Sequence, residues 1–220
     1  MGKEHAMAER SLAKKLWYDA IRVVARLTGV CLFRIRVFGR ENWPTEGGGL
    51  VCPNHQSFLD PLLVGLTCER RLNFLARGSL FKFLPFRLLI SSLDAIPVER
   101  EKSGLAGLKE TLKRLKRGEL VLIFPEGTRT SDGELQPLKG GFIPMARRGG
   151  VPIIPVAVDG AFDAWPRTAK FPRRSVIHIR IAPPISAQMI QDLSDEELLE
   201  ELERRLEAAF SAIRVTRQRA

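Results

Sequence analysis

The sequence lacks the short signature of a serine hydrolase, because no Gly-x-Ser-x-Gly segment occurs in its 220 residues. This absence excludes the strand-to-helix elbow that presents a nucleophilic serine. The three cysteines, Cys31, Cys52 and Cys68, have neither metal-binding nor redox-motif spacing. Buried free thiols in a reducing cytosol are therefore predicted. If the chain catalyses a group transfer, its nucleophile is expected to belong to the substrate.

The sequence also lacks an uninterrupted hydrophobic run that could span a membrane, which takes about 20 mainly apolar residues. The most apolar long window, 16–33, is broken by Asp19, Arg22 and Arg26. Residues 1–11 are polar and lead into no apolar core, so no secretory signal is predicted. Residues 1–33 are predicted to form an amphipathic helix at a membrane surface, and the alternative is a helix packed on the protein's own core. The apolar segment 80–93 is a second candidate membrane-facing element.

Acidic residues are under-represented, since 35 lysines and arginines face 25 aspartates and glutamates and the formal net charge is +10. This balance predicts a negatively charged partner, which can be a phosphorylated substrate, an anionic membrane, an acidic carrier protein or nucleic acid. The chain is long enough for one α/β domain and too short for a second full one.

Apolar strand-like runs alternate with amphipathic helical stretches along the chain. The alternation predicts a single α/β domain over 34–193, with a mixed, mostly parallel sheet flanked by helices. Residues 194–220 are predicted to form a C-terminal amphipathic helix that packs on this domain and opens with a capping box at Ser194 and Glu197. The strand expected at 175–182 alternates in polarity, which places His178 on its solvated face.

The segment 54–60 contains a histidine and an aspartate five residues apart. On one helix, His55 and Asp60 would point about 140° apart. They can meet only if His55 lies on a turn between the apolar strand 49–52 and a helix that begins near Asp60. An imidazole oriented by a carboxylate is suited to general-base catalysis. The alternative is structural, with Asp60 or Ser57 acting as an ordinary helix N-cap.

A second polar motif, 124–129, follows the buried strand predicted at 120–124. Its Glu126 and Arg129 are expected at the carboxyl edge of the sheet, where α/β proteins bind ligands. Arginine forms bidentate hydrogen bonds with phosphate, and Gly127 lets the backbone approach a ligand closely. The alternative is a surface turn with a salt bridge.

Four blocks of this sequence, in order, resemble the glycerolipid acyltransferase family, whose best-known members are the 1-acylglycerol-3-phosphate acyltransferases. The blocks are His55-x4-Asp60, residues 95–100, residues 124–129 and residues 151–155. The resemblance spans residues 54–155 and implies a glycerol-3-phosphate acyltransferase-like fold. Two positions depart from the pattern of many relatives. Asp94 stands where glycine is common, and Arg77 stands where lysine is often found.

The resemblance implies an O-acyltransferase of phospholipid biosynthesis. It would move an acyl group from acyl-CoA or acyl-carrier protein to the sn-2 hydroxyl of 1-acylglycerol 3-phosphate and produce phosphatidic acid. His55 would take the proton of that hydroxyl, and Asp60 would orient the imidazole. No metal and no cofactor besides the acyl-donor substrate are expected.

The same resemblance implies a phosphate-binding set around the third block. Arg129 would hold the acceptor's phosphate, helped by Arg100 or Arg77, with Gly127 and Thr128 in the same substrate-binding turn. Glu126 would either accept a hydrogen bond from the acceptor or brace the arginines.

The alternatives to this activity are an acyltransferase acting on another lysophospholipid or on glycerol 3-phosphate, and a non-catalytic basic module that binds membrane or nucleic acid. The expected partners are a lysophospholipid, the acyl donor and an anionic membrane surface, without nucleic acid. The expected location is the cytoplasmic face of a membrane, where the protein would be peripheral or monotopic without a full transmembrane span.

Overall fold

The computed structural model describes residues 32–77, 96–98 and 105–219. Residues 1–31 of the predicted N-terminal helix, the 80–93 element and Arg100 lie outside these ranges. The described strands form one seven-stranded sheet in the order β1-β7-β6-β2-β5-β3-β4. The strands are β1 (Phe33–Phe38), β2 (Gly49–Pro53), β3 (Leu72–Arg77), β4 (Ile96–Val98), β5 (Leu120–Leu122), β6 (Ile153–Asp159) and β7 (Ser175–Ile181).

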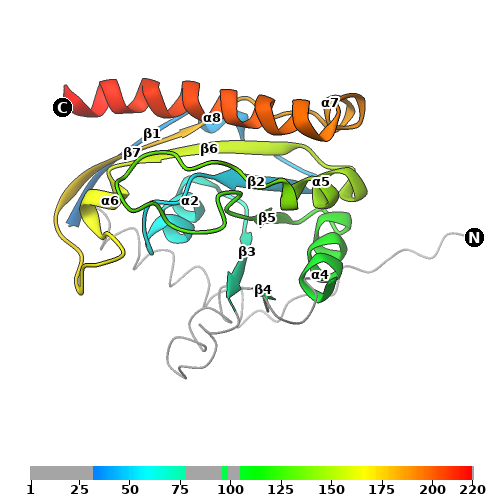
Figure 1. Cartoon of the computed structure of the whole chain (residues 1–220), viewed down its shortest axis with the longest axis horizontal. Coiled ribbons are helices and arrows are strands. Elements are labelled where there is room, and N and C mark those ends of the chain that lie inside the picture. The colour runs from blue at the N-terminus through cyan, green and yellow to red at the C-terminus, as the bar shows by residue number, and fades with distance from the viewer. Residues whose placement is uncertain (1–31, 78–95, 99–104, 220) are drawn as a thin grey trace, which may run out of the picture.

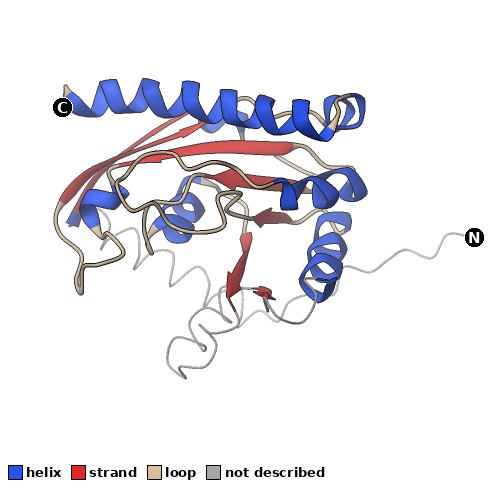
Figure 2. Ribbon diagram, in the orientation of Figure 1, coloured by secondary structure: helices blue, strands red, loops and turns tan. Residues whose placement is uncertain are grey.

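Helices lie on both faces of this sheet, as Figure 2 shows. In Figure 1, α8 runs along one face while α2 and α6 lie against the other. The helical elements are η1 (Arg40–Asn42), α2 (Asp60–Thr67), α4 (Leu105–Lys116), η3 (Gly140–Phe142), α5 (Ile143–Gly149), α6 (Ala161–Ala164), α7 (Ala187–Asp192) and α8 (Asp195–Gln218).

The sheet is mixed and mostly parallel, which confirms the predicted fold class. Only the β6–β7 pair is antiparallel, and every other neighbouring pair is parallel. The carboxyl ends of β2, β3, β5 and β6 therefore share one edge of the sheet. Each of the segments that follow these strands begins at that edge.

The central strands are apolar on both faces because helices cover both faces. Successive side chains of β2 point to opposite sides of the sheet. Val51 packs with Leu63 and Val64 of α2, whereas Leu50 and Cys52 pack in the cluster that contains residues of α4, α5 and α8. Two apolar layers thus hold β2 rigidly just before the chain reaches His55.

The C-terminal helix α8 begins as predicted. Ser194 Oγ accepts the backbone N–H of Glu197 at 3.2 Å, and the Glu197 carboxylate accepts the Ser194 N–H at 2.7 Å, which completes the capping box. The apolar stripe of α8 is buried in the clusters that α8 forms with the sheet and α7; it consists of Leu198, Leu202, Leu206, Phe210 and Ile213.

Two local predictions were wrong. The strand expected over 120–124 ends at Leu122, although the Ile123 N–H still donates to Val51 O at 2.9 Å, and the turn begins at Pro125. His178 was expected on a solvated face, but it is completely buried on β7. Its Nδ1 lies 3.3 Å from the carbonyl oxygen of Ile213, so α8 covers the strand face that alternation alone assigned to solvent.

Candidate active site

The turn between β2 and α2 brings His55 and Asp60 into contact. The His55 Nδ1 atom lies 2.8 Å from Oδ2 of Asp60. Asp60 is completely buried, whereas the His55 side chain is 18% exposed. The pair therefore has an inner carboxylate and an outer imidazole that solvent or a ligand can reach. The sequence spacing predicted this geometry, since a strand-to-helix corner is the arrangement that lets the two residues meet.

The hydrogen bonds of Asp60 determine which imidazole nitrogen carries the proton. Asp60 Oδ2 also accepts the backbone N–H groups of Gln56 and Ser57, both at 2.6 Å. An oxygen that accepts two N–H groups is a carboxylate acceptor, so the hydrogen between it and His55 belongs to Nδ1. The Nε2 atom of His55 is left with its lone pair available to take a proton.

These contacts also correct the N-cap expected at the start of α2. The N-cap position is Leu59, with helical backbone angles and no side-chain cap, and Asp60 is the first helical residue, followed by Pro61. Instead of capping α2, the Asp60 carboxylate turns back and closes the preceding loop. Ser57 Oγ accepts the Leu59 N–H at 3.2 Å.

Aromatic packing holds the imidazole in place. The rings of His55 and Phe124 are stacked, with their centroids 3.7 Å apart and their planes inclined by 15°. Because Phe124 follows β5, the histidine is held between its own loop and the end of a neighbouring strand. Stacking of this kind restricts rotation of the ring around its hydrogen bond to Asp60.

Two buried amide side chains connect the corner to β6 and its continuation. The Asn54 side chain donates to Val158 O at 2.9 Å and accepts the Val158 N–H at 2.7 Å. The Gln56 amide donates to Gly133 O at 2.7 Å, and its oxygen accepts the N–H of Ala161 at 3.1 Å. Neither residue was predicted to belong to the site, although amides on each side of a candidate base are a usable signal.

The turn after β5 lies against this corner, as the parallel sheet requires. The Thr130 N–H donates to His55 O at 2.8 Å, which ties the two segments together. Within the turn, Gly127 donates to Phe124 O at 3.0 Å and has a φ of 73°, a conformation that favours glycine. Gly127 and Thr128 are exposed, so both remain accessible to a ligand.

The guanidinium of Arg129 is positioned by an aromatic ring from the corner itself. Its Cζ atom lies 3.5 Å from the centroid of the Phe58 ring. Phe58 is 45% exposed, so the stacked arginine is near the molecular surface close to His55. Stacking on the ring leaves the edge of a guanidinium able to form hydrogen bonds in its own plane, and a planar guanidinium can bind an anion in a bidentate way.

Glu126 is buried, and its chemistry differs from that expected for an exposed carboxylate. It is 2% exposed, and within the described part of the chain neither carboxyl oxygen accepts a hydrogen bond of good geometry. Burial raises the pKa of Glu126 to about 8, and the Asp60 charge adds to the shift, while the nearby backbone N–H groups of His55 and Gln136 oppose it. With this pKa the group is mostly protonated at neutral pH.

We expect the free energy of unfolding to depend on pH because of the buried Glu126. A carboxyl whose pKa rises from 4.5 to about 8 on folding binds a proton in the folded state that the unfolded chain releases, so stability falls as pH rises through this window. The shift corresponds to about 5 kcal/mol of folding free energy as an upper value. Glu126→Gln should remove this loss and make the variant more stable than the parent in alkali, with little difference in acid.

Denaturant unfolding of the parent and of Glu126→Gln at about pH 5 and about pH 9 measures how the stability of each protein changes with pH. The exposed Glu200→Gln on α8 is the matched control, because it makes the same chemical change away from the site. An unchanged pH slope in Glu126→Gln would show that Glu126 is ionised in the folded protein.

Of the two other arginines predicted in the site, Arg77 and Arg100, only Arg77 lies within the described residues. Arg77 is the last residue of β3 and pairs in register with Val98 of β4, so its backbone is at the same sheet edge as His55. Arg100 lies outside the described residues. Among the described residues, no group of three or more histidines, cysteines, aspartates and glutamates is arranged to hold a metal ion.

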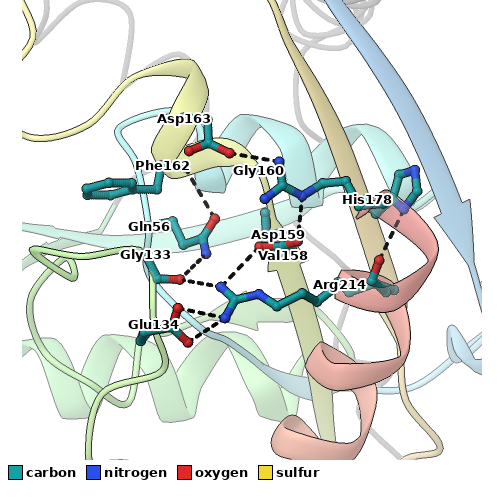
Figure 3. A network of polar contacts seen from close by, with 12 residues as sticks. Gln56, Gly133, Glu134, Val158, Asp159, Gly160, Phe162, Asp163, His178 and Arg214 are labelled. Carbon is teal, nitrogen blue, oxygen red and sulfur yellow. Dashed lines mark hydrogen bonds and ion pairs between the residues drawn. The ribbon is translucent and has the colours of Figure 1, made fainter. Parts of the chain in front are cut away.

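A polar network links this corner to the end of α8 (Figure 3). Gly133 O accepts from Gln56 and, at 3.2 Å, from Arg214, which also pairs with Glu134. Asp159 at the end of β6 is nearly fully buried and accepts from Arg217 Nε at 2.6 Å. This network could not be predicted from the sequence, because its members come from segments that are distant in the chain.

The fold and the site together define a class of enzyme. A histidine–carboxylate pair lies at the carboxyl edge of a parallel sheet, next to a turn that carries an arginine, and no serine elbow occurs in the sequence. This arrangement suits transfer of a group to a hydroxyl that the substrate supplies. The model of the family described as Acyltransferase matches residues 34–159, and the chain belongs to this family.

Individual relatives support the same assignment. The chain is 32% identical over 147 residues to the 1-acyl-sn-glycerol-3-phosphate acyltransferase of Bacillus subtilis, covering 66% of this chain and 71% of that protein. It is 29% identical over 187 residues to the chloroplastic BAT2 enzyme of that name from Brassica napus, covering 83% of this chain and only 54% of the plant protein.

A solved structure also has this fold. The 1-acyl-sn-glycerophosphate (LPA) acyltransferase PlsC of Thermotoga maritima superposes with a TM-score of 0.78 at 26% sequence identity. The match covers 94% of this chain and 84% of the Thermotoga chain. An acyltransferase fold therefore surrounds the His55–Asp60 pair, and the non-catalytic alternative is not supported.

Proposed function

We propose that this chain transfers an acyl group from an acyl thioester to the sn-2 hydroxyl of 1-acylglycerol 3-phosphate and forms phosphatidic acid. The observation that carries the proposal is the hydrogen bond of 2.8 Å between His55 and Asp60, next to the turn that bears Arg129. The names of the Bacillus and Thermotoga relatives support the choice of this acceptor over glycerol 3-phosphate or another lysophospholipid.

The proposed reaction begins at the free Nε2 of His55. It takes the proton of the acceptor hydroxyl while the hydroxyl oxygen attacks the thioester carbonyl, and a C–O bond forms. When the C–S bond breaks, the proton on Nε2 passes to the leaving sulfur, so His55 returns to its neutral form. Asp60 stabilises the imidazolium that exists between these two transfers. Every other contribution to the rate must come from positioning and from stabilising the carbonyl oxygen.

The acceptor's phosphate is proposed to bind at Arg129. Its guanidinium is held on the Phe58 ring within the same corner as the base, and the exposed Gly127 and Thr128 are beside it in the chain. Arg77, at the end of β3, is the proposed helper on the same sheet edge, and Arg100 is a second candidate. Glu126, protonated at neutral pH, would donate a hydrogen bond to the acceptor.

The donor is proposed to be acyl-CoA or an acyl-carrier protein, and the place of action is the cytoplasmic face of a membrane. Both donors are anionic, and the net charge of +10 favours either one. The protein would be peripheral or monotopic there. No described helix combines the length and the apolar character that crossing a membrane demands.

A comparison of acceptors tests this proposal. With purified protein in detergent, 1-acylglycerol 3-phosphate should be acylated far faster than glycerol 3-phosphate or a lysophospholipid with a substituted phosphate. Arg129→Ala should lower kcat/KM for the preferred acceptor about 10²-fold, since a hydrogen bond to a charged group contributes about 1.5–3 kcal/mol. Arg129→Lys should lower kcat/KM by a smaller factor, because lysine keeps the positive charge but cannot form the bidentate contact of a guanidinium.

Arg148→Ala is the matched control, because Arg148 is exposed at the end of α5, which leads to the opposite edge of the sheet. Faster turnover of glycerol 3-phosphate would contradict a phosphate site for this lysolipid. An equal fall of kcat/KM with all acceptors in the Arg129→Ala variant would contradict it too.

A further inference from the structure

The loop between α6 and β7, residues 165–174, combines an exposed aromatic ring with basic charge. Phe171 is 78% exposed, the most exposed large hydrophobic side chain among the described residues. Four basic residues and no acidic residue lie in this ten-residue loop, and all four are exposed: Arg167, Lys170, Arg173 and Arg174. None of these four forms a salt bridge within the described residues. An exposed ring and unpaired cations together fit an anionic lipid surface.

This loop lies at the catalytic edge of the sheet. It follows α6, which begins at the carboxyl end of β6, and β6 is parallel to β2, the strand that precedes His55. Ser57 Oγ donates to Trp165 O at 2.8 Å, and the Phe58 and Trp165 rings have centroids 5.7 Å apart. The loop is therefore attached directly to the catalytic corner, and Figure 1 shows it projecting away from the sheet beyond α6.

The loop is held in shape by its own hydrogen bonds. The Trp165 indole donates to Ala169 O at 3.0 Å, Ala169 N donates to Pro166 O at 3.1 Å, and Arg173 N donates to Ala164 O at 2.7 Å. A loop closed in this way presents Phe171 in a defined direction, so the ordering entropy that a flexible loop would lose on binding is already reduced.

We propose that residues 165–174 are a membrane-docking loop, in which Phe171 enters the lipid interface and the basic side chains bind anionic headgroups. The proposal rests on the proposed function, because a lysolipid acceptor reaches His55 from a bilayer. Phe58, which is 45% exposed and whose ring lies beside that of Trp165, extends the apolar surface from the loop to the catalytic corner. The loop would thus orient the site toward the membrane.

Partitioning of the full chain into vesicles tests the loop without any turnover. Phe171→Ser should weaken binding to phosphatidylcholine vesicles both with and without phosphatidylglycerol. Arg173→Glu with Arg174→Glu should weaken binding about tenfold or more, and only when phosphatidylglycerol is present, since each basic residue near an anionic surface strengthens binding about fivefold.

The matched controls change the same kinds of residue at the other edge of the sheet. Met189→Ser alters an apolar side chain that is 39% exposed on α7. Lys113→Glu with Lys116→Glu makes the same charge change in the last turn of α4, which leads into the amino end of β5. Both controls should partition like the parent, and all four variants should keep acyl transfer within about twofold in detergent micelles.

Parent-like partitioning of both loop variants would overturn the proposal and assign membrane binding to other segments. A second overturning result is unchanged partitioning together with a raised KM for an acyl-carrier protein thioester alone, which would make the loop a carrier-protein site. A protein that partitions through this loop but acylates no lysolipid would contradict the proposed function and leave the docking loop intact.

Discussion

Replacing His55 with alanine is expected to lower kcat for acyl transfer by about 10³-fold or more while leaving the fold intact, since positioned general-base catalysis contributes about 10²–10⁴. In the His55–Asp60 pair, the hydroxyl proton is expected to pass to Nε2, because Nδ1 of His55 is hydrogen-bonded to Asp60. KM for the acceptor should change little, as its phosphate is proposed to bind at Arg129.

Single-turnover acylation with saturating acceptor measures this loss directly, and thermal unfolding serves as the control. His55 is partly exposed, so the variant leaves no large sealed cavity and the melting temperature should stay close to that of the parent. Substantial turnover by a folded His55→Ala protein would refute the mechanism.

The second large effect is expected at Asp60, where two substitutions separate catalysis from folding. Asp60→Asn keeps an oxygen that can accept the N–H groups of His55, Gln56 and Ser57, but it loses the charge that stabilises the imidazolium. Its kcat should fall by about 10²–10³ with a smaller change in stability. Asp60→Ala should lose activity to at least the same extent.

Asp60→Ala should also destabilise the fold. It removes the acceptor of two buried backbone N–H groups, each of which costs about 1–3 kcal/mol when left unsatisfied. Urea unfolding of both variants distinguishes the effects. Equal stability of the asparagine and alanine variants would show that Asp60 does not close the loop, and full activity of Asp60→Asn would show that its charge does not act in catalysis.

Much of this site followed from local patterns in the sequence. The spacing of five between His55 and Asp60 required a strand-to-helix corner, and the alternation of strands and helices implied a parallel sheet that places Arg129 at the same edge. The capping box of α8 could also be predicted, because its residues are only three positions apart in the chain. Helix periodicity, strand alternation and cap residues all act within a few positions of the chain, so the sequence displays them directly.

Other features depended on contacts between distant segments. His178 looked solvent-facing by alternation and is buried because α8 crosses its strand. Glu126 was predicted at the carboxyl edge of the sheet, but its burial, which raises its pKa to about 8, could not be read from the sequence. Gln56, Gly133 and Arg214 share one network although they are separated by 77 or more positions in the chain. Local propensity carries no information about which partner such a residue meets.

The class of fold, the histidine–carboxylate corner and the arginine-bearing turn could all be predicted from the sequence, because backbone geometry restricts where residues at those spacings can lie. The free nitrogen of His55, the burial of Glu126 and the position of the 165–174 loop beside the catalytic corner became known only from the folded chain. Those properties arise from desolvation and from hydrogen bonds between segments, and both exist only once the chain has packed.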